Sequence, residues 1–117
     1  MTLFVTDATN ADITQYSLTS AFDVTSGVAF QGSAATTGQN QPEGITFSPD
    51  GTRVFVTGTS GDDVEAFTLN SGIPFDITQG ITNVSVTSIT DQTQQAQALQ
   101  FTPVSYTHLT LPTILLV

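Results

Sequence analysis

Short runs of β-branched and aromatic residues alternate along the chain with clusters of Gly, Pro, Asn and Asp. Runs of this length, bounded by turn-forming residues, are typical of short antiparallel strands rather than of helices. The runs predict strands at residues 3–6, 13–18, 28–34, 44–48, 53–57, 64–69, 83–89 and 98–102. The pattern therefore predicts an all-β fold.

One segment, residues 91–98, is open to two interpretations. Asp91 is a good helix N-cap residue, and the Gln and Ala residues that follow are fair helix formers, so the segment could form a short helix. An internal repeat of the chain aligns this segment with residues 37–44, which contain Gly and Pro. We therefore favour a loop.

The strand pattern occurs twice, which indicates an internal repeat. Leu3-Phe4-Val5-Thr6 returns as Val54-Phe55-Val56-Thr57, 51 positions later. Residues 21–27 return as 74–80, 53 positions later, and residues 44–49 return as 98–103, 54 positions later. Repeats of this length are typical of stacked β-architectures, in which each unit buries its faces against its neighbours.

Two repeated elements have turn chemistry. In Ser48-Pro49-Asp50-Gly51, Pro presets φ, Asp can accept a bond from the backbone two residues on, and Gly accepts a positive φ. These residues predict a tight reversal that depends on Gly51. Phe22-Asp23 recurs as Phe75-Asp76 in a longer connection, where we expect each ring to pack between layers and each Asp to cap a turn.

Residues 44–57, with the sequence GITFSPDGTRVFVT, resemble the blade repeat of β-propellers, and most closely that of the lactonase-like group. The chain is also similar to propeller repeats of uncharacterised marine bacterial and phage proteins. Those repeats share the elements seen at Asp62–Val64, Phe67–Leu69 and Phe75–Thr78. The resemblance implies antiparallel four-stranded blades, about two of them, from an incomplete ring whose central channel is lined by residues 44–48 and 98–102.

This resemblance implies a division of the chain. Residues 1–103 would be a β-propeller fragment: 1–43 the last three strands of one blade plus a linker, 44–90 one full blade, and 91–103 the start of a third. Two stacked blades leave apolar faces without a neighbour, so we expect oligomerisation, aggregation or partial unfolding.

The repeat stops at Val104. Residues 104–113, VSYTHLTLPT, resemble an in-frame translation of a transposon-end adapter used in sequencing libraries, and a variable index would then supply residues 114–116 before Val117. We interpret residues 104–117 as a non-native tail. The alternative is a genuine apolar C-terminal strand.

Charge narrows the range of partners. The chain has ten acidic residues against a single basic one, Arg53, and a formal net charge of −9. Nucleic acids and anionic membrane surfaces are bound by clustered Lys and Arg, so neither is expected as a partner. The expected partners are the remaining blades of the parent propeller and a protein or glycan ligand. The sparse charge and the abundance of Thr, Ser, Gln and Gly favour a secreted or virion-associated protein.

Candidate chemistry is sparse. Asp62 and Asp63, with Asp12 in the matching turn, are weak candidates for a metal site, although adjacent acids in a Gly turn more often cap that turn. Glu43 has Gln97 at its matching position and no partner base. His108, the only histidine, lies in the suspected tail, and the chain has no cysteine. We therefore predict no catalytic residue and no cofactor.

Two functions remain open from the sequence. The first is a binding or structural scaffold built from propeller repeats. The alternative is a piece of a propeller enzyme, lactonase-like or dehydrogenase-like, whose active site lies in other blades. Asn83-Val84-Ser85 also matches a glycosylation sequon.

Overall fold

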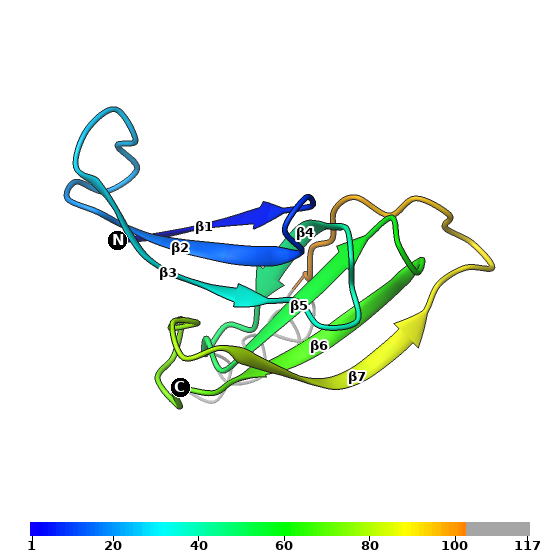
Figure 1. The fold of residues 1–117 in the computed structure, drawn as a ribbon. Helices are drawn as coiled ribbons and strands as arrows, with labels where there is room; N and C mark the ends of the chain where they lie inside the picture. The colour runs from blue at the N-terminus through cyan, green and yellow to red at the C-terminus, as the bar shows by residue number, and fades with distance from the viewer. Residues whose placement is uncertain (103–117) are drawn as a thin grey trace, which may run out of the picture.

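The computed structural model describes residues 1–102, in which seven strands form two antiparallel sheets (Figure 1). The first sheet contains β1 (Thr2–Asp7), β2 (Asp12–Leu18) and β3 (Val28–Ala35), in that order. The second contains β4 (Pro42–Phe47), β5 (Arg53–Gly58), β6 (Asp63–Leu69) and β7 (Ile81–Ser88), in that order. Within each sheet, every strand pairs with the next along the chain, and the predicted all-β fold is confirmed.

Seven of the predicted strands are present, with ends within two residues of those expected. The prediction of a strand at 98–102 is wrong, because this segment has no strand geometry. The Phe101 ring packs on Phe55, with ring centroids 4.8 Å apart, so the segment contacts a sheet face rather than a free edge. Residues 91–98 form a loop, as favoured. No helix in the described part of the chain is long and apolar enough to cross a membrane.

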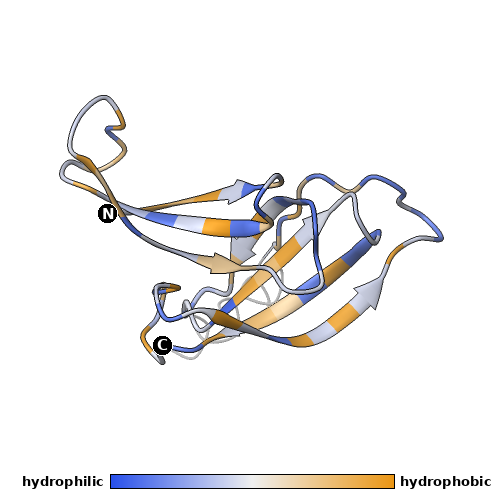
Figure 2. Ribbon diagram, viewed as in Figure 1, coloured by the Kyte–Doolittle hydropathy of each residue, from blue (hydrophilic) through white to orange (hydrophobic). Residues whose placement is uncertain are grey.

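The core lies between the two sheets, because each strand places alternate side chains on the shared interior. In Figure 2 apolar and polar positions alternate along several strands. The first sheet contributes Ile13 and Ala34, and the second contributes Val54, Val56, Phe67 and Leu69. Ile77, from the loop before β7, completes the core and is 0% exposed.

One buried polar side chain links the two sheets. Gln15 of β2 is 6% exposed, and its Oε1 accepts a hydrogen bond of 2.9 Å from the Ile77 backbone N–H. Its Nε2 donates to Gln31 Oε1 at 2.9 Å. A buried backbone N–H without an acceptor is costly, so this glutamine stabilises the loop that carries Ile77 against the first sheet.

Unusual backbone conformations recur in the two sheets. Ala11 has φ of 55° and Asp62, 51 positions later, has φ of 50°. Phe22 has φ of 61° and Phe75, 53 positions later, has φ of 60°. A positive φ is uncommon for residues other than glycine, so the same irregularity at matching positions indicates equivalent local structure.

Loop hydrogen bonds recur with the same spacing. Two pairs of backbone bonds match: Thr19 N–H to Gly27 C=O with Asn70 N–H to Gly80 C=O, and Thr36 N–H to Ala11 C=O with Ile89 N–H to Asp62 C=O. The two strand irregularities also match, at Gln15/Tyr16 in β2 and at Ala66/Phe67 in β6. The sheets are therefore alike beyond their strands.

The turn at residues 48–51 forms as predicted. Gly51 N–H donates to Ser48 C=O at 2.8 Å, and the Asp50 carboxylate accepts a bond of 3.1 Å from Thr52 N–H. Bonds from the Ser48 hydroxyl and from Thr52 lower the pKa of Asp50 to about 2. Gly51 has φ of +73°, and a Cβ atom there would lie 2.3 Å from the Phe75 ring.

In the recurrent Phe-Asp pairs, both Asp residues cap turns as predicted, but only one of the two Phe rings packs against another ring. Asp23 and Asp76 cap their turns by accepting the N–H groups of Thr25 and Thr78. Phe75 packs on Phe47, with centroids 5.3 Å apart. The prediction for Phe22 is wrong: its ring is 86% exposed, because no described layer lies on its side of the first sheet.

Candidate functional site

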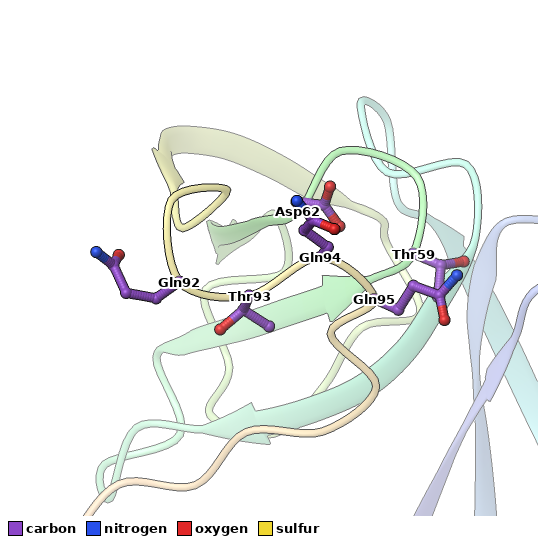
Figure 3. A pocket seen from close by; sticks show the side chains of 6 residues that line it. All are labelled: Thr59, Asp62, Gln92, Thr93, Gln94 and Gln95. Atoms are coloured by element: carbon purple, nitrogen blue, oxygen red, sulfur yellow. The ribbon is translucent and has the colours of Figure 1, made fainter.

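A polar depression lies at one end of the second sheet, where the β5–β6 turn meets the loop that follows β7. It has a volume of about 660 Å³. Its lining residues, drawn in Figure 3, are Thr59, Asp62, Gln92, Thr93, Gln94 and Gln95. In that view the Gln92 side chain points away from the others.

Backbone hydrogen bonds hold the loop against the turn. Ile89 N–H donates to Asp62 C=O at 2.8 Å, and the N–H groups of Gln92 and Thr93 both donate to Ile89 C=O. The positive φ of Asp62 directs the turn so that its carbonyl can accept the bond from Ile89. The glutamine-rich segment is thus attached at its base, and its side chains project into solvent.

The linker between the sheets, residues 36–41, supports the same end of the molecule. Gln39 is 0% exposed, and its Nε2 donates to Asp63 Oδ1 at 3.1 Å. Gln41 Oε1 accepts a bond of 2.7 Å from the Thr59 hydroxyl on the rim of the depression. The Thr36 hydroxyl donates to Gln39 C=O at 2.9 Å, which closes the linker into a compact turn.

A buried carboxylate lies beside the linker. Glu65 of β6 is 1% exposed, and its oxygens accept bonds from Asn83 Nδ2 at 2.7 Å and Gln39 Nε2 at 3.4 Å. Burial, followed by the charge of Asp63, raises the pKa of Glu65 to about 7. A Cβ atom on Gly38 would lie 2.7 Å from Glu65 Oε1, so the linker backbone approaches the carboxylate closely.

The three weak metal candidates lie in two places. Asp62 lines the depression, and the neighbouring Asp63 accepts from Gln39. Burial and the Asp62 charge raise the pKa of Asp63. Asp12 lies in the first sheet, opposite Asp7 of β1, and burial followed by the Asp7 charge raises its pKa. Asp12 Oδ1 is buried without a hydrogen-bond partner. Within residues 1–102, no three His, Cys, Asp or Glu side chains gather as a metal ion would need.

The other candidates lie apart from the depression or outside the described residues. Glu43 is exposed in β4, at the register irregularity between Pro42 and Gly44. Asn83 of the sequon donates to Glu65, so its amide is part of the buried cluster. His108, and the whole proposed tail at 104–117, lie outside the described residues.

Sequence reasoning missed the residues that build this end of the molecule. The sequence pattern indicates no role for Gln39, for Glu65 or for the glutamines of residues 92–95. A usable signal existed for Glu65, because it occupies a strand position where Phe67 and Leu69 predict an inward-facing apolar residue. For Gln39 no local signal existed, since its burial depends on the packing of two distant strands.

The depression can offer amide, hydroxyl and carboxylate groups, which suit hydrogen bonding to a polar ligand. Its lining contains no basic residue and no histidine that could activate a nucleophile. Comparison of the chain with protein-family models, curated proteins and solved structures found no match.

Proposed function

We propose that the two sheets are successive blades of a β-propeller-type repeat and that the chain serves as a structural or binding scaffold. The observation that carries the proposal is the regular recurrence of equivalent features: positive φ values, loop hydrogen bonds and strand irregularities all recur after 51 or 53 residues. Independent sheets would not be expected to share such details, whereas units of one repeat would.

Packing between the sheets supports the same proposal. Sheets that stack face to face, each burying an apolar surface against the next, are the unit of propeller and solenoid architectures. Here the shared core contains Ile13 from one sheet and Val56 from the other, both 0% exposed. The second sheet has the four antiparallel strands, in sequential order, that a blade requires.

The segment after β7 supports continuation of the repeat. Phe101 packs on Phe55 at 4.8 Å, as Phe47 packs on Phe4 at 4.5 Å. Phe101 follows Phe47 by 54 positions and Phe55 follows Phe4 by 51, so the same aromatic contact is made one unit further along. Residues 98–102 would then begin a third blade.

Loops at the end of the sheets would provide the binding surface of such a scaffold. A rigid sheet positions its connecting loops, and loops so positioned are where scaffolds bind ligands. The glutamine- and threonine-lined depression is a surface of this kind, and Gln39 binds Asp63 beside it.

The test is a crystal structure of a single chain in which residues 1–102 are repeated three times in tandem. We expect a closed ring of stacked sheets, with the segments equivalent to β4 around a central channel. A two-copy chain is the control and should give an open arc in small-angle scattering. A straight rod of sheets, or sheets that do not stack, would overturn the proposal.

A further inference from the structure

Within residues 1–102, the first sheet has an unpaired edge at β1. All strand pairing of β1 runs to β2, whereas β5, which follows β1 by 51 residues, is paired on both sides. Among residues 1–102, the edge that β4 occupies in the second sheet has no counterpart in the first. An unpaired strand edge is a template for a strand from another chain.

The outward face next to this edge is apolar and exposed. Val5 is 44% exposed, but its counterpart Val56 is 0% exposed; Val24 is 61% exposed, but its counterpart Ile77 is 0% exposed. Val56 of the second sheet and Ile77 of the loop before β7 are buried against the first sheet. The outward face of the first sheet therefore carries the residues of an interface and has no described neighbour.

Residues 98–102 have the composition that fits this edge. They follow the segment 44–48 by 54 positions, yet they form no strand, and Phe101 is 55% exposed. Neither they nor residues 2–6 include a charged side chain, although the whole chain carries a net charge of −9. Contact between two copies through these segments therefore avoids placing like charges together.

We infer that residues 98–102 of one copy add to β1 of a second copy as an antiparallel edge strand. By analogy with β4 and β5, Leu99 would lie opposite Val5, as Ile45 lies opposite Val56. Phe101 would then cover the Phe22 ring, as Phe47 contacts Phe75. The inference rests on the repeat equivalence of the proposed function.

The two surfaces in this contact differ, so the association is head-to-tail. Such an interface closes into a ring when the rotation per copy allows it and otherwise continues as an open chain. Because both contacting surfaces belong to the same chain, the 117-residue chain can associate with further copies of itself.

Disulfide trapping tests the register, because the chain has no cysteine of its own. Separately purified Val5→Cys and Leu99→Cys chains are mixed under a mild oxidant, and the mixed disulfide is quantified by mass spectrometry. We expect roughly fivefold more mixed disulfide than from Val5→Cys mixed with Gln97→Cys, since bridging needs Cβ atoms about 4 Å apart. Equal yields from the two mixtures would overturn the inference.

A double variant, Val5→Cys with Leu99→Cys in one chain, tests whether the strand reaches its own β1. At low concentration we expect little intrachain disulfide. A predominant intrachain disulfide would overturn the inference.

Sedimentation of full-length chains gives an independent test. Phe22→Ser should weaken self-association by about tenfold, because it removes the ring that Phe101 would cover. Ile73→Ser is the matched control, since Ile73 is also exposed, at 59%, but lies at the position equivalent to Ser20. A monomeric native chain at all concentrations would overturn the inference. The tandem chain can still close into a ring in that case, so the two proposals fail separately.

Discussion

The loop before β3 and the loop before β7 have the same local structure but different surroundings. Phe22 and Phe75 have φ values of 61° and 60°, and the Asp residue after each accepts an N–H bond of 2.9 Å. Yet Val24 is 61% exposed and its counterpart Ile77 is 0% exposed. Local sequence determines the path of each loop, whereas a neighbouring sheet determines which side chains become core.

The comparison distinguishes loop conformation, which depends on nearby residues, from side-chain burial, which depends on a neighbouring sheet. Turn residues act over two or three positions, so both loops form alike wherever they lie. Burial requires a partner surface, which only the loop of the second sheet has in the described residues. Substitutions at matching positions of the two loops should therefore have unequal effects on stability.

The largest expected effect is at Ile77. Ile77→Ala should lower the free energy of unfolding by about 3 kcal/mol, because it opens a cavity in the core between the sheets. Val24→Ala, at the matching position, should change it by less than about 0.5 kcal/mol. Urea denaturation at low protein concentration measures both. Equal losses at the two positions would show that Val24 is also buried against a partner surface.

A second difference between matching positions is electrostatic, because Glu65 on the second sheet corresponds to Thr14 on the first. The folded-state pKa of Glu65 is raised to about 7 from an ordinary 4.5, so between these values the folded chain holds a proton that the unfolded chain has released. Stability should therefore fall as pH rises from about 4.5 to about 7, by on the order of 2 kcal/mol.

Chemical denaturation across this pH range, on the native chain and on Glu65→Gln, measures the contribution. The variant should lose most of the decrease. Glu43→Gln is the control, since it makes the same substitution at an exposed glutamate. An unchanged profile in Glu65→Gln would show that its carboxylate is not desolvated in solution.

Alanine substitutions at Gly51 and Gly72 distinguish the cost of backbone strain from the cost of displacing the Phe75 ring. Both have positive φ, +73° and +71°, but a Cβ atom at Gly51 would meet the Phe75 ring at 2.3 Å, and one at Gly72 would have no neighbour within 4 Å. Gly72→Ala should cost about 1 kcal/mol from the left-handed backbone alone. Gly51→Ala should cost about 1.5 kcal/mol more, since the ring must move. Thermal unfolding compares them, and equal costs would mean that the ring moves freely.

Most of the fold could be predicted from the sequence, because strands and turns depend on local patterns. The seven strands and the turn ending at Gly51 follow from runs of β-branched residues and from turn residues. The strand expected at 98–102 does not form, since a strand requires an edge to pair with and the repeat pattern alone does not supply one. The polar cluster formed by Gln39, Asp63 and Glu65 could not be predicted, because tertiary packing alone brings these three side chains together.

The smallest expected effect concerns the hydrogen bond that joins the two sheets. Gln15 on the first sheet accepts the Ile77 N–H, but the residue that follows it by 51 positions is Ala66, which has no such side chain. Gln15→Ala should cost about 1 kcal/mol in urea denaturation, because it leaves a buried N–H unpaired. Gln31→Ala removes only the partner of the Gln15 amide and should cost less. Amide hydrogen exchange adds a local readout: the Ile77 N–H should exchange faster in Gln15→Ala and at the native rate in Gln31→Ala. An unchanged rate in Gln15→Ala would show that packing of the Ile77 side chain alone holds this loop against the first sheet.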